Sequence, residues 1–318
     1  MPSRRTLLAG LTLASPALAG VARAQGTAPR EVRIGFQKTG LLYIDKQRGL
    51  IEARFRAQNV PVRWVEFTFG PPLLEALNVG SIDYGSVGDT PPIFAQAAGA
   101  NLVYVAAQEA AGSGSAILVP PNSPIQRLED LRGKRIGFAR ASSSHNLTVA
   151  ALEKAGIAWN EITPVQLPPA DARAAFERGS LDAWTIWDPF FALAEGRPGV
   201  RVLALARGIA VQNSYFLANR DFATRHPQAV AAINEELVRT ATWSEANRPE
   251  VARILSEASG IELPAWERAV SRLEFTVGPV TESVIVEQQK VADRFHRLGL
   301  IPRPVAVRDI VWTWRPQA

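Results

Sequence analysis

Apolar and polar positions follow two different rhythms along this chain. Short apolar runs such as 32–36, 62–67 and 82–87 predict buried strands, and the segments between them carry apolar residues at helical spacing. Proline pairs at 71–72 and 91–92 mark the start of two of these helices, because proline fits the first helical turn. Strands that alternate with helices predict an α/β fold with largely parallel sheets.

The alternation continues as far as residue 217. We expect strands at 32–36, 62–67, 82–87, 102–107, 116–119, 135–138, 162–167, 182–186, 200–206 and 214–217. We expect helices at 44–56, 74–79, 93–98, 128–131, 142–155 and 171–178. After residue 219 the pattern predicts helices alone, at 227–246, 250–259, 266–273 and 282–298.

This distribution predicts two α/β lobes with a cleft between them. The chain would leave the first lobe near 116–119 and return near 214–217, and the C-terminal helices would pack mainly on the first lobe. The expected division is 25–115 for the first part of lobe one, 116–216 for lobe two and 217–318 for the rest of lobe one. A cleft between two lobes is a common place for a small-molecule site.

The first 24 residues have the composition of a cleaved secretory signal peptide. Arg4 and Arg5 precede a stretch of leucine, alanine and small residues, and the small-x-small pattern at 22–24 predicts cleavage after Ala24. The paired arginines favour twin-arginine export, and a Sec signal that happens to carry two arginines is the alternative. Export predicts a periplasmic protein.

Composition limits the partners of the exported chain. Without residues 1–24, which hold three arginines and no acid, the chain carries 32 basic and 30 acidic residues, a net charge of +2. This balance argues against nucleic acid, because nucleic-acid-binding proteins carry a strongly basic face. The absence of cysteine excludes disulfides and cysteine-ligated metals. We expect no cofactor and no metal, and a monomer.

Three consecutive serines stand where a predicted strand passes into a predicted helix. Ser142, Ser143 and Ser144 are followed there by His145 and Asn146. Hydroxyl donors beside the free N–H groups of a first helical turn are suited to a small anion. An ordinary N-cap is the alternative, although one serine would suffice for it.

Two other turns lie at the carboxyl ends of predicted strands, where open α/β sheets bind their ligands. Gly88 permits close approach of the backbone, and Asp89 or Thr90 can cap the helix that follows. Gln37 and Lys38 follow the first strand and offer a donor and a positive charge, or else belong to a solvated loop.

Two later strand ends complete the candidate set. Trp187 and Asp188 end one strand, and side-chain alternation places Trp187 on the face opposite Trp184. Trp187 is therefore a candidate wall for an apolar ligand tail, and Trp184 is expected in the core. Ser214 and Tyr215 lie at the expected return between the lobes.

The sequence offers little for catalysis. Of its three histidines, His226 and His296 have the positions of surface or capping residues. No nucleophile elbow, P-loop or dinucleotide fingerprint is present, and no cluster of histidines and acids has metal-ligand spacing. We therefore expect a binding protein and not an enzyme.

Several longer segments carry a more specific signal. The strongest are WVEF at 64–67, GP at 70–71, LEALNVGSID at 74–83 and GDTPPIFAQAAGA at 88–100; shorter ones are QK at 37–38, SSSHN at 142–146, PADARAAF at 169–176, DAW at 182–184 and IWDP at 186–189. Together, over Val32 to Trp312, these segments resemble the periplasmic aliphatic-sulfonate-binding proteins of ABC importers, which are relatives of the taurine and nitrate receptors.

The resemblance implies an α/β fold with two lobes, the type II periplasmic-binding-protein fold. Each lobe would be a mixed, mostly parallel sheet flanked by helices, and the lobes would close on a small organic anion and deliver it to the permease subunits of an ABC importer. The ligand would lie near the residues already selected: Gln37, Gly88–Thr90, Ser142–Asn146, Trp187–Asp188 and Ser214–Tyr215.

The exact ligand stays open. Residues 39–43 differ from the form typical of sulfonate receptors, so that Tyr43 becomes a second candidate for the tail wall, and taurine, nitrate or a thiamine precursor are the alternative ligands. Asp89 and Asp188 would cap helices, pair with Lys38 or hold the amino group of a zwitterion. A desulfinase with a related fold uses a cysteine nucleophile, which this chain lacks.

Overall fold

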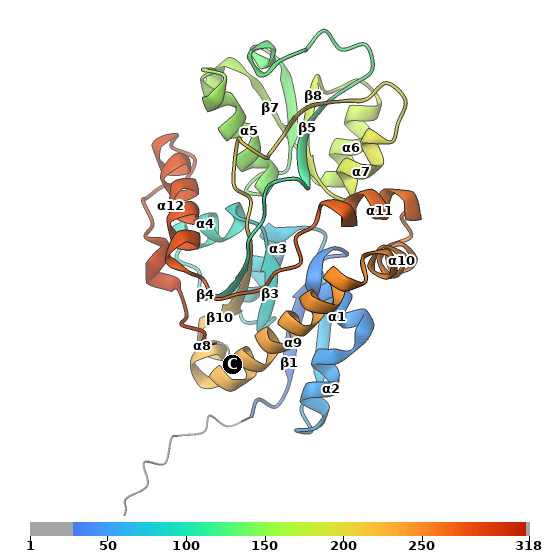
Figure 1. The fold of residues 1–318 in the computed structure, drawn as a ribbon. Coiled ribbons are helices and arrows are strands. Elements are labelled where there is room, and N and C mark those ends of the chain that lie inside the picture. Colours follow the sequence, from blue (N-terminus) through green and yellow to red (C-terminus); the bar gives the residue numbers. More distant parts are fainter. Residues whose placement is uncertain (1–27, 316–318) are drawn as a thin grey trace, which may run out of the picture.

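The computed structural model describes residues 28–315 and folds them into two lobes, which lie one above the other in Figure 1. Each lobe is built on a five-stranded sheet with helices packed around it. The expected architecture of two α/β lobes with mixed sheets is confirmed. The predicted signal segment, 1–24, lies outside the described residues.

The first sheet combines the N-terminal strands with one that comes from much later in the chain. Its order is β2-β1-β3-β10-β4. The strands are β1 (Val32–Phe36), β2 (Val62–Glu66), β3 (Tyr84–Val87), β4 (Leu102–Gln108) and β10 (Ser214–Asn219). Only β10 runs against the others, between β3 and β4. The carboxyl ends of β1, β2 and β3 therefore meet at one edge, which faces the second lobe.

The second sheet repeats this plan. Its order is β7-β6-β8-β5-β9, with β5 antiparallel to both of its neighbours. The strands are β5 (Ser115–Val119), β6 (Arg135–Phe138), β7 (Thr163–Gln166), β8 (Ala183–Trp187) and β9 (Arg201–Leu205). The strand expectations agree with these bounds to within two residues.

The helices surround both sheets. Lobe one carries α1 (Gly40–Arg48), α2 (Leu50–Arg56), α3 (Gly70–Asn78) and α4 (Thr90–Ala97); lobe two carries α5 (Ser143–Lys154), α6 (Pro169–Glu177) and α7 (Phe190–Glu195). The C-terminal helices are α8 (Arg220–Arg225), α9 (Pro227–Ala246), α10 (Arg248–Ser259), α11 (Leu263–Arg272) and α12 (Glu282–Arg297). Short 3-10 turns are η1 (Leu128–Leu131), η2 (Trp159–Glu161) and η3 (Val307–Ile310).

The single helix expected at 44–56 is two helices. Gly49 adopts a φ of 69° and ends α1, with its N–H donating to the carbonyl of Asp45 at 2.7 Å. Glycine is the residue that tolerates this left-handed conformation at a helix end. The apolar spacing continues across Gly49, so the pattern alone does not reveal the break.

The chain crosses between the sheets twice, along residues 109–114 and 206–213. Ser115 already begins a strand of the second sheet, and Ser214 already begins a strand of the first. The segment 214–217, expected as the return between the lobes, is therefore part of an interior strand of lobe one. The chain has changed sheets by residue 214, whereas the expected end of lobe two was residue 216.

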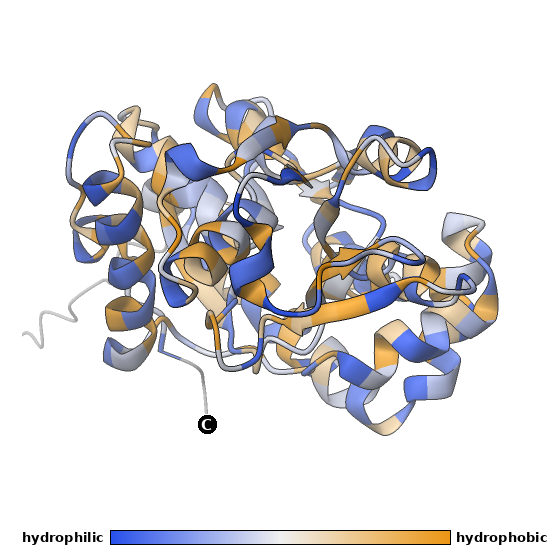
Figure 2. Cartoon of the chain, turned by 90° about the horizontal axis from the view of Figure 1, so that it is seen from above, coloured by the Kyte–Doolittle hydropathy of each residue, from blue (hydrophilic) through white to orange (hydrophobic). Residues whose placement is uncertain are grey.

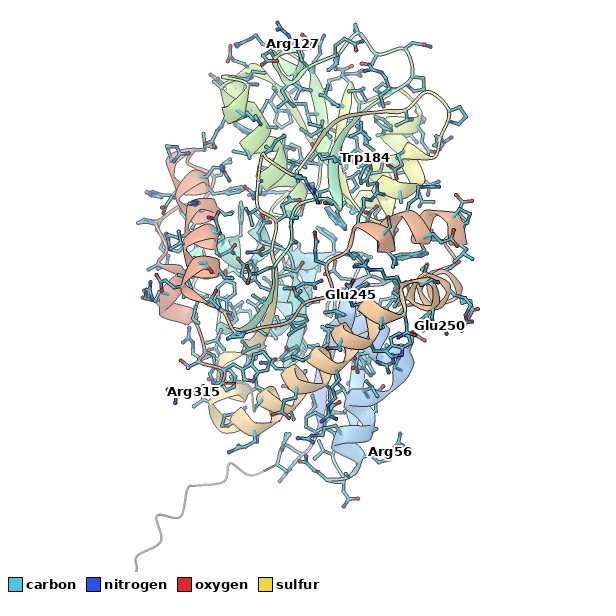
Figure 3. All side chains as sticks on the ribbon, in the orientation of Figure 1. Arg56, Arg127, Trp184, Glu245, Glu250 and Arg315 are labelled. Atoms are coloured by element: carbon cyan, nitrogen blue, oxygen red, sulfur yellow. The ribbon has the colours of Figure 1, made fainter. Side chains whose placement is uncertain are left out.

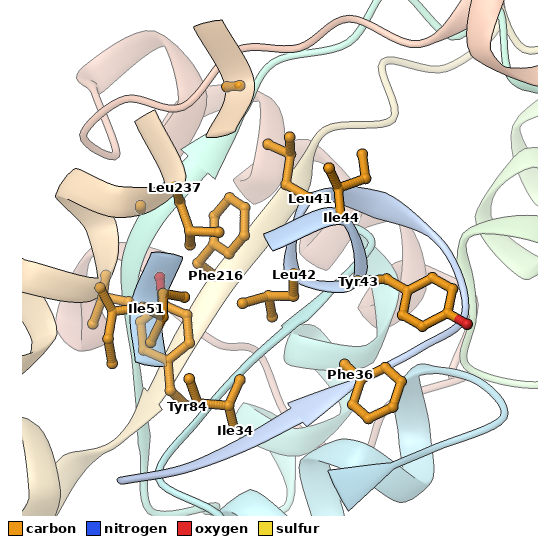
Figure 4. Packing of buried hydrophobic residues seen from close by; sticks show 14 of the residues in the cluster. Ile34, Phe36, Leu41, Leu42, Tyr43, Ile44, Ile51, Tyr84, Phe216 and Leu237 are labelled. Atoms are coloured by element: carbon orange, nitrogen blue, oxygen red, sulfur yellow. The ribbon is translucent and has the colours of Figure 1, made fainter. Parts of the chain in front are cut away.

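The cores of the lobes are largely separate apolar clusters, although Ala192 of α7 joins the lobe-one cluster. In lobe one, Leu42 and Ile44 of α1 pack with Phe216 of β10 and Leu237 of α9, as the close-up in Figure 4 shows. In lobe two, Trp184 is completely buried, as expected, and its place among the side chains of the upper lobe is labelled in Figure 3. Seen from above, the outer helices carry both hydrophilic and hydrophobic residues (Figure 2), since one face of each helix covers a core.

The C-terminal helices pack mainly, but not only, on lobe one. Helix α9 contacts α1 and α2, and α12 contacts α4. Helix α11, however, also packs against α7 of lobe two, which lies next to it in Figure 1. The end of α11 is thereby brought to the boundary between the lobes.

Asp45 provides a test of this packing. Its carboxylate is fully buried between α1, α2 and α9, where it accepts hydrogen bonds from the Thr240 hydroxyl at 2.6 Å and the Ile51 N–H at 3.1 Å. Burial raises the pKa of Asp45 to about 6, although these hydrogen bonds oppose the rise. The folded state thus holds this proton more tightly than the unfolded chain does.

We expect the stability that this group contributes at low pH to be lost as the pH rises through 6. Asp45→Asn removes the titration, so the fall in the free energy of unfolding between pH 5 and pH 7 should be smaller than in the wild type by about 1 kcal/mol. Urea denaturation of both proteins at the two pH values measures the difference. Identical pH dependence in the two proteins would contradict the assignment.

Candidate functional site

A cleft of about 180 Å³ lies between the lobes. Seven of the predicted site residues line it: Gln37, Gly88, Ser142, Ser143, Trp187, Asp188 and Ser214. They come from both lobes, at the carboxyl ends of β1, β3, β6 and β8 and at the start of the antiparallel β10, because these edges of the two sheets face each other across the cleft. The strand-end reasoning therefore identified one continuous cavity.

The N-terminus of α5 forms one wall of the cleft, and its serine hydroxyls are already engaged. Ser142 Oγ donates to the carbonyl of Ala139 at 2.7 Å and lies 2.8 Å from Ser144 Oγ, which accepts the Ala139 N–H at 3.2 Å. The hydroxyls thus hold the turn. The His145 and Asn146 N–H groups donate to the Ser142 carbonyl, whereas the Ser143 and Ser144 amides begin the helix, where the chain offers them no helical acceptor, and leave a partial positive charge beside the cleft.

Asp89 joins the lobes instead of facing the cleft. It is 1% exposed, and its carboxylate accepts from Asn146 Nδ2 of lobe two at 2.6 Å and from the Thr90 hydroxyl at 2.8 Å. Burial raises the pKa of Asp89, and hydrogen bonds from Ser143, Asn146 and Thr90 oppose the rise. Gly88 beside it is packed so closely that a Cβ would collide with the Ser143 hydroxyl.

Asp188 has a partner that the sequence did not suggest. Arg272 at the end of α11 donates to both of its carboxylate oxygens at 3.0 Å and also pairs with Glu195 at 2.7 Å. The Ala192 N–H adds a third hydrogen bond to Asp188 at 3.0 Å. Burial raises the pKa of Asp188 to about 6 in spite of Arg272. This cluster forms a second contact between the lobes, at the wall of the cleft.

The other predicted residues do not line the cleft. Thr90, Ser144, Asn146 and Tyr215 are buried behind it, and Lys38 is exposed and pairs with Glu66 at 3.2 Å. Their proposed contact with a ligand therefore has no support from their position.

His145 and Tyr43 are also buried away from the cleft. His145 stacks on Phe138 at 4.7 Å, its Nδ1 accepts the Ala141 N–H at 3.3 Å, and burial lowers its pKa to about 3. The imidazole is thus neutral at physiological pH. Tyr43 stacks on Phe36 at 5.5 Å in the lobe-one core.

Sequence reasoning missed a third part of the lining. Arg272 ends α11, and it reaches the cleft together with the next three residues, Leu273, Glu274 and Phe275. Gln212 comes from the second crossing. Gln212 donates to the carbonyl of Ser143 at 2.7 Å and so ties this crossing to the α5 turn. No pattern in the sequence indicates that α11 ends between the lobes.

The lining suits binding of a small, weakly hydrated anion. Gln37 donates one amide hydrogen to the carbonyl of Ser86 at 3.1 Å, which leaves its second hydrogen available. Leu41, Trp187 and Phe275 provide apolar surface in the same cavity. Among residues 28–315, no group of three or more histidine, cysteine or acidic side chains is arranged to hold a metal ion.

Two lobes with mixed five-stranded sheets, joined by two crossings around a cleft, define the periplasmic-binding-protein fold. Residues 42–252 match the family model described as NMT1/THI5 like. A relative from Escherichia coli (strain K12), an aliphatic sulfonates-binding protein, is 40% identical over 90% of both chains. The chain therefore belongs to the NMT1/THI5-like family and, within it, to the aliphatic sulfonate-binding proteins.

Solved structures agree with this assignment. The periplasmic aliphatic sulphonate binding protein from Escherichia coli is similar with a TM-score of 0.84 and 39% identity, over 92% of this chain and 94% of that one. The alkanesulfonate-binding protein from Xanthomonas axonopodis pv. citri, solved with bound MOPS, gives a TM-score of 0.85 and 41% identity, over 90% and 99% of the two chains.

The Arg272 cluster leads to a prediction about how the lobes are held. Arg272→Gln leaves the buried carboxylate of Asp188 without its cation, and we expect the free energy of unfolding at pH 7 to fall by about 3 kcal/mol. Arg253→Gln is the matched control, because Arg253 pairs with Glu250 on an exposed surface, where solvent screens the pair and its loss should change the free energy of unfolding much less. Equal losses in urea denaturation of the two variants would show that the cluster does not hold the lobes.

Proposed function

We propose that this protein is the periplasmic solute-binding component of an ABC importer and that it captures aliphatic sulfonates in the cleft. The observation that carries the proposal is the α5 turn, whose serine hydroxyls hold the first amides of the helix beside a cavity that also has an apolar wall. The similarity to sulfonate-binding proteins over nearly the whole chain supports the same ligand class.

The head of the ligand would lie against the N-terminus of α5. A sulfonate is ionised at any physiological pH, so it needs permanent donors and no general base. The first-turn amides near Ser142 and Ser143, together with Gln37 across the cleft, would supply them. Gly88 supports this position because its lack of a side chain leaves the backbone close to the same turn.

Within the cleft, the tail would lie along Trp187, with Leu41 and Phe275 nearby. Trp187 presents a large apolar face, and its neighbour Trp184 is committed to the core. The apolar wall favours alkanesulfonates over nitrate, which has no tail to bury.

Taurine is the closest alternative, and the two aspartates argue against it as the preferred ligand. Holding its ammonium group would need a carboxylate with spare capacity in the cleft. Asp89 is occupied by Asn146 and Thr90, and Asp188 by Arg272. Glu274 also lines the cleft and accepts the Ala111 N–H at 3.2 Å, so an amino-substituted tail would have to bind at this carboxylate.

A binding role fits this cleft better than catalysis. Within residues 28–315, the lining contains no histidine, and the chain has no cysteine to act as a nucleophile. The relatives with close similarity are binding proteins.

Among residues 28–315, no helix has the length and apolar character of a membrane span. We infer export by the twin-arginine or Sec route, function as a monomer, and a permease that recognises the closed form.

Isothermal titration of residues 25–318 tests the proposal. The ligands are ethanesulfonate, octanesulfonate, taurine, sulfate, nitrate and a hydroxymethylpyrimidine. We expect alkanesulfonates to bind with micromolar affinity or better, about −8 kcal/mol, taurine more weakly, and sulfate and nitrate not at all. If the protein bound nitrate or the pyrimidine but no sulfonate, the proposed ligand class would be overturned.

Trp187→Ala tests the tail wall separately. We expect it to weaken octanesulfonate at least tenfold and ethanesulfonate less, because a longer tail contacts more of the indole. Trp243→Ala is the control, since Trp243 lies on α9 under Arg48 and does not line the cleft. A uniform loss for both ligands, or the same loss in both variants, would speak against a specific contact with the tail.

A further inference from the structure

A second hollow, about 580 Å³ in volume, opens beside the cleft. We call it the mouth groove. Its walls come from α3 and α4 of lobe one and from the β6–α5 and β7–α6 loops of lobe two. Its apolar surface includes Phe69, Pro71, Leu74, Phe94, Ala98 and Leu167. Both lobes must be in place for the groove to exist in this form.

The mouth groove lies on the side of the molecule away from the two crossings. The crossings join β4 to β5 and β9 to β10, which lie toward one side of each sheet. The groove takes its loops from β2, β6 and β7, which lie toward the opposite side of each sheet. This is the side where the lobes separate when a two-lobed protein opens about its crossings.

The groove adjoins the cleft, and the two hollows share part of their walls. Pro91 lines both hollows. Gly70 lines the cleft while its neighbours Phe69 and Pro71 line the groove. A molecule held in the cleft thus has an apolar surface directly beyond Pro91.

The loop that binds the head also forms part of the groove. Ser142 lines the cleft, and the two residues before it, Arg140 and Ala141, line the groove. Ala141 has a φ of 56°, a left-handed conformation that is unfavourable for a residue with a side chain. The Ala141 N–H donates to His145 Nδ1, which helps to hold this turn. This strained turn therefore has the polar wall of the cleft on one side and the mouth groove on the other.

We propose that the mouth groove binds the distal part of a long alkyl tail whose sulfonate head occupies the cleft; this inference rests on the proposed function. The cleft measures about 180 Å³, which is small beside the groove of about 580 Å³, so it would hold the head and only the first part of a long chain. A longer tail extends past Pro91 into the groove. The protein would then select amphiphilic alkanesulfonates, with each added methylene in the groove improving affinity by up to about fourfold.

The test is a chain-length series titrated into the mature protein and three variants. The ligands are ethane-, hexane-, octane-, decane- and dodecanesulfonate, below their micellar concentrations. Ala98→Glu places a charge at an exposed position of the groove, and Ala95→Glu places one a turn earlier on the same helix. Ala170→Glu is the matched control, because Ala170 is exposed on α6 and lines neither hollow.

In the wild type we expect affinity to keep rising from octane- to dodecanesulfonate. In Ala98→Glu and Ala95→Glu this gain should disappear, so that dodecanesulfonate loses at least about tenfold, while the affinity for ethanesulfonate changes less than twofold. Ala170→Glu should match the wild type throughout.

A wild-type affinity that stops rising at octanesulfonate, or groove variants that keep the full gain, would overturn the tail site and leave the proposed function standing. If the wild type bound no alkanesulfonate of the series, ethanesulfonate included, the proposed function and the tail site would both be overturned.

Discussion

The buried contact between Asp89 and Asn146 fixes how the two lobes face each other. Asn146 Nδ2 donates to Asp89 at 2.6 Å, while its oxygen accepts from Arg294 of α12 at 2.8 Å, so that the amide has one possible orientation. Gln288 of the same helix donates to the Asp89 carbonyl at 2.6 Å. Helix α12 thus braces the point where α4 meets α5, and Arg294 and Arg297 extend the brace to Glu153.

This contact explains why the serine run serves the site indirectly. Because Asp89 engages the start of α5, the Ser142 and Ser144 hydroxyls are used to shape the turn and are not directed at a ligand. What remains for an anion is the backbone at the helix start. Amide donors held by a rigid turn do not reorganise on binding, which makes them better suited to a permanent anion than mobile hydroxyls.

The sequence predicts those parts of the molecule that local patterns specify. Strand ends, proline-marked helix starts and the face of Trp187 all depend on neighbours in the chain, and they agree with the structure. The break at Gly49 is missed because apolar spacing runs through it. Arg272 is missed for a different reason: its partners Asp188 and Glu195 are 84 and 77 positions away, and no local pattern reports a contact at that separation.

Charge compensation in the cleft is the physical basis of the preference among anions that we propose for the site. Arg272 is the cation among the lining residues, but it is shared by Asp188 and Glu195, so it offers little net attraction to a ligand. A dianion such as sulfate would have to shed its water for a site with dipoles and no free cation, which is costly. A sulfonate carries one charge spread over three oxygens and brings an apolar tail. The energy of burying that tail offsets the desolvation of the head, so the apolar wall is part of the anion selectivity and not an addition to it.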